Sequence, residues 1–520
     1  MDPEALHRQL LDPATYPEPT RHVDYRETHI SRVYLTDSHA YKLKKPLKLG
    51  FLDYSTLDRR EFFCAEEVRL NRRFAPDTYL GVATLNADHG MLRFNGKGPL
   101  IDYAVRMRRL PDDRMLDTLV ERNAPDLPGE IARLAGHLAA LFAALPPCRG
   151  GADGHAADVR ANCEENLAQT LPVIGKPLSS EAHRLMAART ESELARLVPL
   201  FAAREAAGFV RDGHGDLHAR NICMTDPVRV YDCIEFCRRF RVDDVAAELA
   251  FLLMDLEFRG RRDLAETFLA RYRECAADPD LAALLPFYKS YRAWVRGKVE
   301  ALLSGETDAA PATRAAAGER AAKYFNLALG YYVQPVLLLT AGLMGVGKST
   351  LARALAETLG ARLLRSDVIR KELAGLHRGR AQPDAFGAGL YAPAATARTY
   401  AEMQRQVETL LHRGCSVVVD ASFARDADRQ AFFALAAACG VPAWLLHLQC
   451  ARDLALNRLD RRQAEGGDPS DGRRALFAPQ AALFEPVAAG PRVIAIDSSA
   501  DVNYNVQKIA CRLLAGRDYP

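Results

Sequence analysis

The sequence predicts a multi-domain chain in which an α+β domain is followed by an α/β domain with a doubly wound parallel sheet. Strand-like runs gather between residues 29 and 107, and helical patterns continue from there to about 330. From residue 335 onward strand and helix patterns alternate, which is typical of a parallel sheet covered by helices. The chain has 520 residues. At roughly 150 residues per domain, that length suggests about two to four folded units.

Composition narrows the class of protein. Hydrophobic residues make up 49% of the chain and charged residues 26%, as in ordinary globular proteins. The formal net charge of +3 disfavours nucleic acid or an anionic membrane as a partner. The chain opens with acidic and polar residues, and its apolar runs fall short of the ~20 residues of a membrane span. We therefore expect a cytoplasmic protein.

The first domain begins with predicted strands. Residues 32–35 and 40–44 form a predicted hairpin, because both runs are rich in β-formers and a polar turn joins them. A helical pattern covers 55–74, and further strand-like runs lie at 79–85, 91–94 and 100–107. Helical patterns then cover 115–121, 129–145, 157–170 and 180–205. A strand-rich lobe followed by a helical lobe is the predicted arrangement.

The segment from Phe209 to Phe236 carries the chemistry of this domain. It contains HGDLHARN, then two short strands at 221–224 and 228–231, and then an aspartate. Asp216 could orient a hydroxyl group and accept its proton. Asn221 and Asp232 could hold Mg²⁺ against nucleotide phosphates. This pattern indicates phosphoryl transfer.

The segments HGDLHARN and YDCIEF resemble the aminoglycoside phosphotransferase and choline kinase-like family, a branch of the protein-kinase fold. The resemblance implies a bilobal domain over 1–330, with a small lobe at about 20–110 and a helical lobe at about 111–330. It implies that Asp216 is the catalytic aspartate and that Asn221 and Asp232 are the metal ligands. His214 matches the structural histidine that opens the loop.

The same resemblance places an ATP-positioning lysine in AYKLKK, at Lys42 or Lys44. Alternation along a strand puts both side chains on one face, so spacing does not separate them, and we favour Lys42. The helical partner of that lysine would be Glu67, with Glu66 as the second choice. The segment lacks a G-x-G-x-x-G pattern, so a domain that only binds nucleotide is the alternative.

The second domain opens with a phosphate-binding loop pattern, in which an apolar run leads into GLMGVGKST and then a helical pattern. Glycines let backbone N–H groups turn toward phosphate oxygens, and the helix dipole adds positive potential. Lys348 would reach the β- and γ-phosphates, and Ser349 would hold Mg²⁺. The nucleotide-binding residues predicted here are Gly342, Leu343, Met344, Gly345, Val346, Gly347, Lys348, Ser349 and Thr350.

Chemical residues also follow the later strands, which we expect at 336–340, 362–365, 416–419, 443–448 and 492–496, with a last helix near 505–514. Asp420 ends an apolar strand, as expected of a second Mg²⁺ ligand. Asp367 could take the proton of an acceptor hydroxyl, and Arg370 could hold an anionic group of that acceptor.

Three arginines lie three or four residues apart on one predicted helix: Arg458, Arg461 and Arg462. A loop at 466–472 with glycine and proline follows them. Cations beside such a loop suit a lid that neutralises phosphate charge, and a solvated charged helix is the alternative. We expect Arg458 and Arg462 to contact the nucleotide.

The motifs GLMGVGKST, SDVIRK, VVVDASF and NRLDRR together resemble the small P-loop kinases, a group that includes zeta-toxin, gluconate kinase and the kinase half of polynucleotide kinase. The resemblance places Asp367 and Arg370 on the acceptor side and the three arginines on the lid. With the first resemblance, it indicates a bacterial fusion of two kinase-like domains, divided near residue 330.

These observations predict an ATP- and Mg²⁺-dependent phosphotransferase with two nucleotide sites and a small-molecule hydroxyl as acceptor. One alternative is a regulatory switch, in which one domain binds or hydrolyses ATP and gates the other. Another is a nucleic-acid end kinase, which the modest net charge and the lack of an aromatic and basic groove pattern disfavour.

Overall fold

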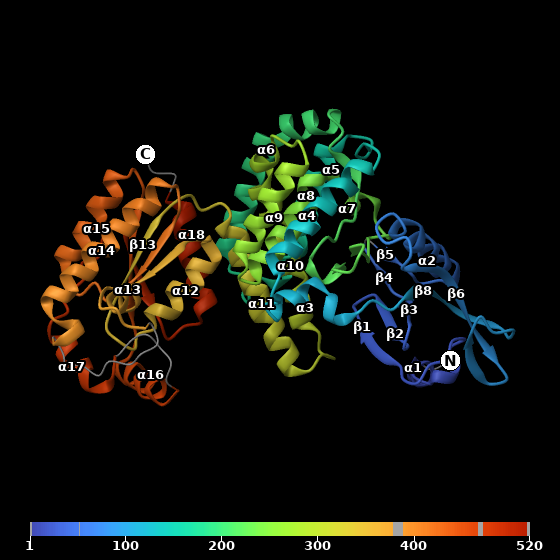
Figure 1. Cartoon of the computed structure of the whole chain (residues 1–520), viewed down its shortest axis with the longest axis horizontal. Coiled ribbons are helices and arrows are strands. Elements are labelled where there is room, and N and C mark those ends of the chain that lie inside the picture. The colour runs from blue at the N-terminus through green and yellow to red at the C-terminus, as the bar shows by residue number, and fades with distance from the viewer. Residues whose placement is uncertain (1–2, 51, 378–387, 466–471, 517–520) are drawn as a thin grey trace. The chain divides into compact units, whose positions relative to one another are not determined.

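The computed structural model describes residues 3–50, 52–377, 388–465 and 472–516 (Figure 1). The chain divides into two compact units, the first made of residues 1–165 and 193–289 and the second of 166–192 and 290–520. The helices between 290 and 330 therefore group with the second unit, whereas the sequence predicts them in the first domain. A functional boundary near 330 stays a prediction.

An antiparallel sheet of six strands forms one part of the first unit, in the order β1-β2-β3-β8-β6-β7. Its strands are β1 (Asp24–Glu27), β2 (Ser31–Leu35), β3 (His39–Lys44), β6 (Tyr79–Asp88), β7 (Met91–Phe94) and β8 (Leu100–Arg108). The predicted hairpin is confirmed, because β2 pairs with β3 in antiparallel register, with Tyr34 opposite Tyr41. The short strands β4 (Lys48–Leu49) and β5 (Leu52–Asp53) pair separately.

Both faces of this sheet are covered. Helix α2 (Leu57–Asn71) begins after Thr56, whose hydroxyl accepts a hydrogen bond from the Arg59 backbone N–H at 3.3 Å. It packs against β6 and β8, and Cys64 and Val68 of α2 are buried there beside Val105. The opposite face buries Tyr34, Tyr41, Leu85 and Phe94 together with residues of the N-terminal segment. This double burial fixes the register of the strands.

The rest of the first unit is mainly helical. Its elements are α3 (Leu116–Glu121), α4 (Leu127–Ala144), α5 (His155–Gln169), α7 (Arg238–Arg241), α8 (Val245–Phe258) and α9 (Arg262–Cys275). Helices α6 (Ser180–Ala206) and α10 (Leu281–Gly305) contribute residues to both units. Two short ladders pair β9 (Val210–Asp212) with β12 (Val242–Asp244) and β10 (Ile222–Cys223) with β11 (Arg229–Val230).

Helix α8 anchors the residues that precede it. Asp244 caps this helix by accepting a hydrogen bond from the Ala246 backbone N–H at 2.8 Å. Its carboxylate also pairs with the buried Arg204 guanidinium at 2.7 and 2.8 Å. Asp244 thus has the contacts of a structural residue, and a carboxylate at this position also suits the helix dipole. Among the described residues, no helix is both long and apolar enough to cross a bilayer.

The second unit contains a parallel sheet of five strands in the order β14-β15-β13-β16-β17. The strands are β13 (Leu337–Ala341), β14 (Arg362–Arg365), β15 (Val417–Asp420), β16 (Ala443–Gln449) and β17 (Val493–Asp497). The predicted parallel sheet is confirmed, and each strand lies within a residue or two of its predicted range. From β13 the chain crosses to the edge strand β14 and returns to β15, and it then continues on the other side of β13 through β16 and β17. The loop after β13 therefore lies at the topological switch point.

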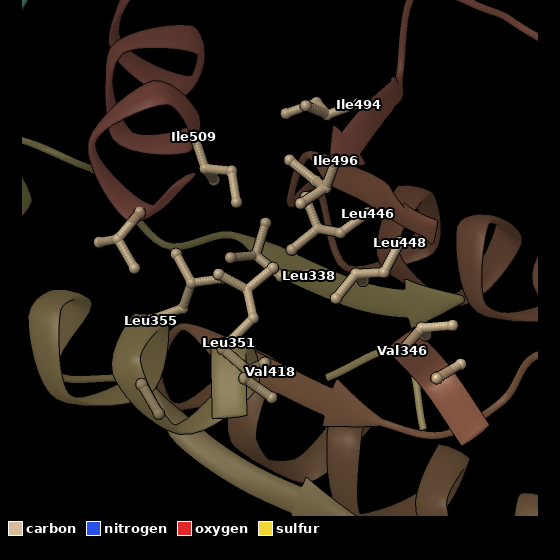
Figure 2. Close-up of a cluster of buried hydrophobic side chains, with 14 of the residues drawn as sticks. Leu338, Val346, Leu351, Leu355, Val418, Leu446, Leu448, Ile494, Ile496 and Ile509 are labelled. Atoms are coloured by element: carbon tan, nitrogen blue, oxygen red, sulfur yellow. The ribbon is translucent and has the colours of Figure 1, made fainter. Parts of the chain in front are cut away.

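Helices cover both faces of this sheet (Figure 1). They are α12 (Lys348–Leu359), α13 (Ser366–Leu373), α14 (Pro393–His412), α15 (Asp426–Ala438), α16 (Arg452–Glu465), α17 (Arg474–Ala482) and α18 (Val502–Ala515). Figure 2 shows the core on the α12 and α18 side, where Leu351 and Leu355 meet Leu338 and Ile509. Each such fully buried side chain contributes about 1.5–3 kcal/mol of transfer free energy.

Helix α11 (Pro311–Gly330) adds a further layer to the second unit, because it packs against α12 and α18. The approach to α12 is close: a Cβ atom built on Gly330 would lie 2.4 Å from the carbonyl oxygen of Thr358. On its other side α11 contacts α10, where the rings of Trp294 and Phe325 meet edge to face at 4.8 Å. Helix α11 is therefore an integral part of the α/β unit.

Candidate functional site

The phosphate-binding loop joins β13 to α12, as the sequence predicts. Gly342, Gly345 and Gly347 have φ values of +144°, +80° and +87°, which residues with side chains rarely adopt. A Cβ atom on Gly342 would lie 2.6 Å from the Leu448 carbonyl oxygen, and one on Gly345 would lie 2.5 Å from that of Ala455. The turn thus favours glycine at all three positions, and the neighbouring backbone also excludes a side chain at Gly342 and Gly345.

Lys348 is the first residue of α12, and its Nζ donates a hydrogen bond to the Leu343 carbonyl oxygen at 2.8 Å. Burial lowers the pKa of Lys348, and the carboxylates of Asp420 and Asp367 act in the opposite direction. Asp420 ends β15, is buried, and accepts a hydrogen bond from the Arg365 Nε at 3.2 Å. The lysine and both predicted carboxylates thus share one electrostatic environment.

A cavity of about 990 Å³ brings most of the predicted residues of this unit together. The predicted residues that line it are Met344, Gly345, Gly347, Lys348, Ser349, Thr350, Asp367, Arg370, Asp420, Arg458, Arg461 and Arg462. Among the described residues of the loop, Gly342, Leu343 and Val346 are not part of this lining. Val346 instead packs into the hydrophobic core (Figure 2).

Arg370 of α13 is buried within this region, with its guanidinium 4.5 Å from the centre of the Tyr391 ring. Its Nη1 donates to the Leu390 carbonyl oxygen at 3.3 Å, and its buried Nε has no hydrogen-bond partner among the described residues. A buried guanidinium with an unsatisfied donor is a suitable partner for an anionic group.

The three arginines of α16 differ in their contacts. Arg458 Nη2 donates to the Ser498 carbonyl oxygen at 2.8 Å, and Arg462 Nη2 donates to that of Gly472 at 2.6 Å. Arg461 forms an exposed pair with Glu465 at 2.9 Å. Of the predicted lid loop at 466–472, residues 466–471 lie outside the described residues.

Sequence reasoning missed Gln480 of α17. Its Oε1 accepts a hydrogen bond from the Met344 backbone N–H at 2.7 Å and so helps to hold the phosphate-binding loop. The two residues are 136 positions apart, and no local pattern marks a glutamine for this contact. Only the tertiary packing of α17 reveals it.

In the first unit, Lys42 and Lys44 of β3 lie on one face, as alternation predicts, and both contact Glu67 of α2. Lys42 Nζ lies 2.9 Å from Glu67 Oε1, and Lys44 Nζ lies 2.6 Å from Glu67 Oε2. Lys42 also contacts the Asp232 carboxylate. Although burial acts to lower it, the pKa of Lys42 is raised well above its ordinary value by Asp232 and Glu67. Glu66, the second choice, pairs with Arg69 instead.

Lys44 lies deeper than Lys42 and contacts Glu235, which also contacts the Tyr54 hydroxyl. The Lys44 side chain is fully buried, whereas 10% of the Lys42 side chain is exposed. Glu235 is the second acidic residue of YDCIEF, after Asp232, and no sequence pattern gave it a role. Because Lys44 is enclosed by these carboxylates, its contacts are those of a structural ion pair.

The predicted catalytic loop places Asp216 beside Asn221. The Asn221 Nδ2 donates to the Asp216 carbonyl oxygen at 3.0 Å and to its Oδ2 at 3.1 Å. The His218 Nε2 lies 3.3 Å from the same carboxylate oxygen. Since the Asn221 amide nitrogen is engaged, its amide oxygen is the atom that could serve as a ligand.

Buried hydrogen bonds hold this loop in place. Glu248 Oε1 accepts from the backbone N–H groups of His214 and Gly215, both at 2.7 Å. The His214 Nε2 lies 2.8 Å from the Tyr231 carbonyl oxygen, and burial lowers the pKa of this histidine to about 4. Asp232 has a φ of +67°, and its backbone N–H donates to the Tyr79 hydroxyl at 3.0 Å.

The donor atoms of both sites suit Mg²⁺. Carboxylate, amide and hydroxyl oxygens are available from Asp232 and Asn221 in the first unit and from Asp420 and Ser349 in the second. Within the described residues, no group of three or more His, Cys, Asp or Glu side chains could form an all-protein metal site. Mg²⁺ in nucleotide sites is held by one or two carboxylates together with phosphates and water, which agrees with this donor set.

Comparisons with known proteins give a family model that matches part of the second unit and relatives that span most of the chain. A family model described as an AAA domain matches residues 337–487. Uncharacterized protein Rv2004c of Mycobacterium tuberculosis (strain ATCC 25618 / H37Rv) is 32% identical over 477 residues, which cover 91% of this chain and 92% of that protein. Uncharacterized protein Mb2027c of Mycobacterium bovis matches to the same extent. The chain belongs to the family of these mycobacterial proteins.

Solved structures resemble about a third of the chain. A gluconokinase from Sinorhizobium meliloti 1021 is 18% identical, with 36% of this chain and 94% of that chain covered and a TM-score of 0.26. The M. tuberculosis APS kinase CysC, in complex with AMPPNP and APS, is 15% identical, with 35% and 98% covered and a TM-score of 0.27. Chaetomium thermophilum Kti12, in complex with ADP-AlF3, is 20% identical, with 35% and 100% covered and a TM-score of 0.27.

Proposed function

We propose that the protein is an ATP-dependent phosphotransferase with two nucleotide sites, each of which transfers the γ-phosphoryl group to a hydroxyl of a small molecule. One observation carries the proposal. The cavity of the second unit is lined both by phosphate-binding residues, Lys348 and Ser349, and by a candidate base, Asp367, with Arg370 beside it. A site that only hydrolysed nucleotide would not need Asp367 and Arg370, the residues assigned to the acceptor.

In the second unit, Lys348 binds the β- and γ-phosphates, and Arg458 and Arg462 contact the nucleotide. Ser349 and Asp420 would hold Mg²⁺, which neutralises phosphate charge when bound. Asp367 accepts the proton of the acceptor hydroxyl while the oxygen of that hydroxyl forms a bond to the γ-phosphorus. At the same time the bond between the γ-phosphorus and the β,γ-bridging oxygen breaks. Arg370 holds an anionic group of the acceptor. The ADP that leaves retains the bridging oxygen.

In the first unit, we infer a protein-kinase-like domain of the aminoglycoside phosphotransferase type. Lys42 positions the phosphates and is itself positioned by Glu67. Asp216 accepts the proton of the hydroxyl, and Asn221 and Asp232 would hold Mg²⁺. Support comes from the contacts of Lys42 with Glu67 and Asp232, of which Asp232 lies 190 positions away in the sequence. The contact of Asn221 with Asp216 within the predicted catalytic loop adds to this support.

The experiment that tests this function is transfer of radiolabelled γ-phosphate from ATP into a metabolite extract. Asp216→Ala and Lys348→Ala should each remove a different set of labelled products, because each variant disables one site. Wild-type labelling in both variants would refute the proposal. A 5′-hydroxyl oligonucleotide belongs among the acceptors, since its labelling would favour a nucleic-acid end kinase.

A regulatory switch is the second candidate. It is favoured by helices α6 and α10, each of which contributes residues to both units. ATP hydrolysis without any acceptor, changed by a substitution in the opposite unit, would favour the switch over a second transferase. Independent ATP binding by the two sites would count against it.

A further inference from the structure

One wall of the cavity of the second unit, formed at and after the end of the last strand of the sheet, has only uncharged lining residues. It runs from the end of β17 to the first turn of α18, over residues 496–505, and is called here the β17–α18 wall. Its lining residues are Ile496, Ser498, Ala500, Val502 and Asn505. The cationic lining residues lie elsewhere in the cavity: Lys348, Arg370, Arg425, Arg458, Arg461 and Arg462. An uncharged wall with one amide suits a flat heteroaromatic base better than a phosphate chain.

Hydrogen bonds near the cavity hold the β17–α18 wall. The Arg458 Nη2 donates to the Ser498 carbonyl oxygen at 2.8 Å, and the Asn505 Nδ2 donates to the Asp497 carbonyl oxygen at 2.9 Å. The Asp501 carboxylate caps α18 by accepting from the backbone N–H groups of Asn503 and Tyr504 at 2.8 and 3.1 Å.

The wall is also held from behind by residues outside the region that the AAA-domain model matches. The Asn326 Nδ2 of α11 donates to the Asn503 carbonyl oxygen at 2.9 Å. The Gln507 Nε2 of α18 donates to the Asn326 Oδ1 at 3.1 Å. Gln507 Oε1 accepts from the Ser179 backbone N–H at 2.8 Å. These hydrogen bonds connect Ser179 to Gln507, Gln507 to Asn326 of α11, and Asn326 to the first turn of α18.

This network is almost completely buried, since only 1% of Asn326 and 3% of Gln507 is exposed. Buried amides whose groups are all hydrogen-bonded fix one arrangement of the backbone, because any shift leaves a polar group unpaired. The hydrophobic contacts between α11 and α18 are less directional and do not by themselves set the position of the Asn503 carbonyl.

We propose that Asn326 and Gln507 are positioning residues that hold the β17–α18 wall in place to receive the base of the nucleotide. The inference rests on the proposed function, because it requires that the second unit binds ATP. It assigns a role in nucleotide recognition to α11, which precedes the phosphate-binding loop in the chain.

The test compares MgATP with magnesium tripolyphosphate, which has the phosphates but no base, by calorimetric titration of the full chain. Binding of either ligand that is present in the wild type and absent in Lys348→Ala is assigned to the second unit. Gln507→Leu and Asn326→Ala should weaken ATP binding by about tenfold, the effect of one lost hydrogen bond, and leave tripolyphosphate binding unchanged. Asn326→Ala supplies the same comparison if Gln507→Leu does not fold.

Ser290→Ala is the matched control. The Ser290 hydroxyl is buried and donates to the Ala328 carbonyl oxygen of α11 at 2.9 Å, so its loss loosens α11 without touching α18. This variant should keep the wild-type ratio of the two affinities. If Gln507→Leu and Asn326→Ala kept the wild-type ratio of ATP affinity to tripolyphosphate affinity, this inference would be overturned, and the proposed function would be unaffected. A wild-type chain with no Lys348-dependent ATP binding would contradict the proposed function itself.

Discussion

Lys42 Nζ of β3 lies 2.9 Å from Glu67 Oε1 of α2 in a buried ion pair. The second oxygen of the same carboxylate lies 2.6 Å from Lys44 Nζ, so one glutamate serves two lysines. The two lysines differ in their second carboxylate partner. Lys42 contacts Asp232, whose side chain is 40% exposed, whereas Lys44 contacts Glu235, whose side chain is 4% exposed. This difference separates two roles that the sequence leaves open.

Lys42→Met should weaken ATP binding by the first unit roughly a hundredfold, because a charge that contacts the phosphates is lost. The fold should survive, since Glu67 keeps its contact with Lys44. Calorimetric titration in a Lys348→Ala background, which silences the second site, measures this binding.

Lys44→Met should instead lower the free energy of unfolding by about 3–5 kcal/mol, because it leaves Glu235 buried without its cation. Urea titration followed by circular dichroism measures this loss. If Lys44→Met abolished ATP binding at full stability while Lys42→Met bound normally, the two roles would be exchanged.

The stability of the first unit should depend on pH through His214. Its pKa falls from 6.5 to about 4 on folding, so between these pH values the unfolded chain binds more protons than the folded one. The free energy of unfolding should therefore fall by up to ~3 kcal/mol as the pH drops from 6.5 to 4. His214→Gln should remove this part of the pH dependence.

Circular dichroism during urea titration at several pH values checks the prediction. Both tryptophans, Trp294 and Trp444, belong to the second unit, so their fluorescence reports that unit separately. His22→Gln is the matched control, because the His22 side chain is 76% exposed. Equal pH dependence in the wild type and His214→Gln would show that His214 is not the group responsible.

Gly345→Ala should distort the phosphate-binding loop. The new Cβ would meet the Ala455 carbonyl oxygen at 2.5 Å, in addition to the cost of a φ of +80°. Gly440→Ala has a similar φ of +68° but open space, so it should cost only roughly 1–2 kcal/mol. Nucleotide binding by the second unit should fall more than roughly tenfold in Gly345→Ala and stay normal in Gly440→Ala. Equal binding by both variants would contradict the steric argument.

Local patterns predicted much of the second unit correctly. The run at 336–340 followed by GLMGVGKST indicates a buried strand, a glycine turn and a helix, and β13, the loop and α12 confirm it. The structure also places Asp420 at the end of an apolar strand in the same sheet, as the sequence predicts, and its role as an Mg²⁺ ligand stays a prediction. These features depend on residues close together in the sequence, where periodicity and turn chemistry are informative.

Contacts between distant segments could not be predicted in this way. Gln480 reaches Met344 across 136 residues, and Asn326 reaches Asn503 across 177. The grouping of residues 290–330 with the second unit depends on the packing of α11 against α12 and α18. A helical pattern shows which face is apolar and not which partner that face meets.

The stoichiometry of MgATP binding to the full chain tests the central claim of two nucleotide sites most directly. Calorimetric titration should give two ATP molecules per chain for the wild type and one each for Lys348→Ala and Asp232→Ala. The double variant should bind none. A wild-type stoichiometry of one, abolished by Lys348→Ala and unchanged by Asp232→Ala, would contradict the claim.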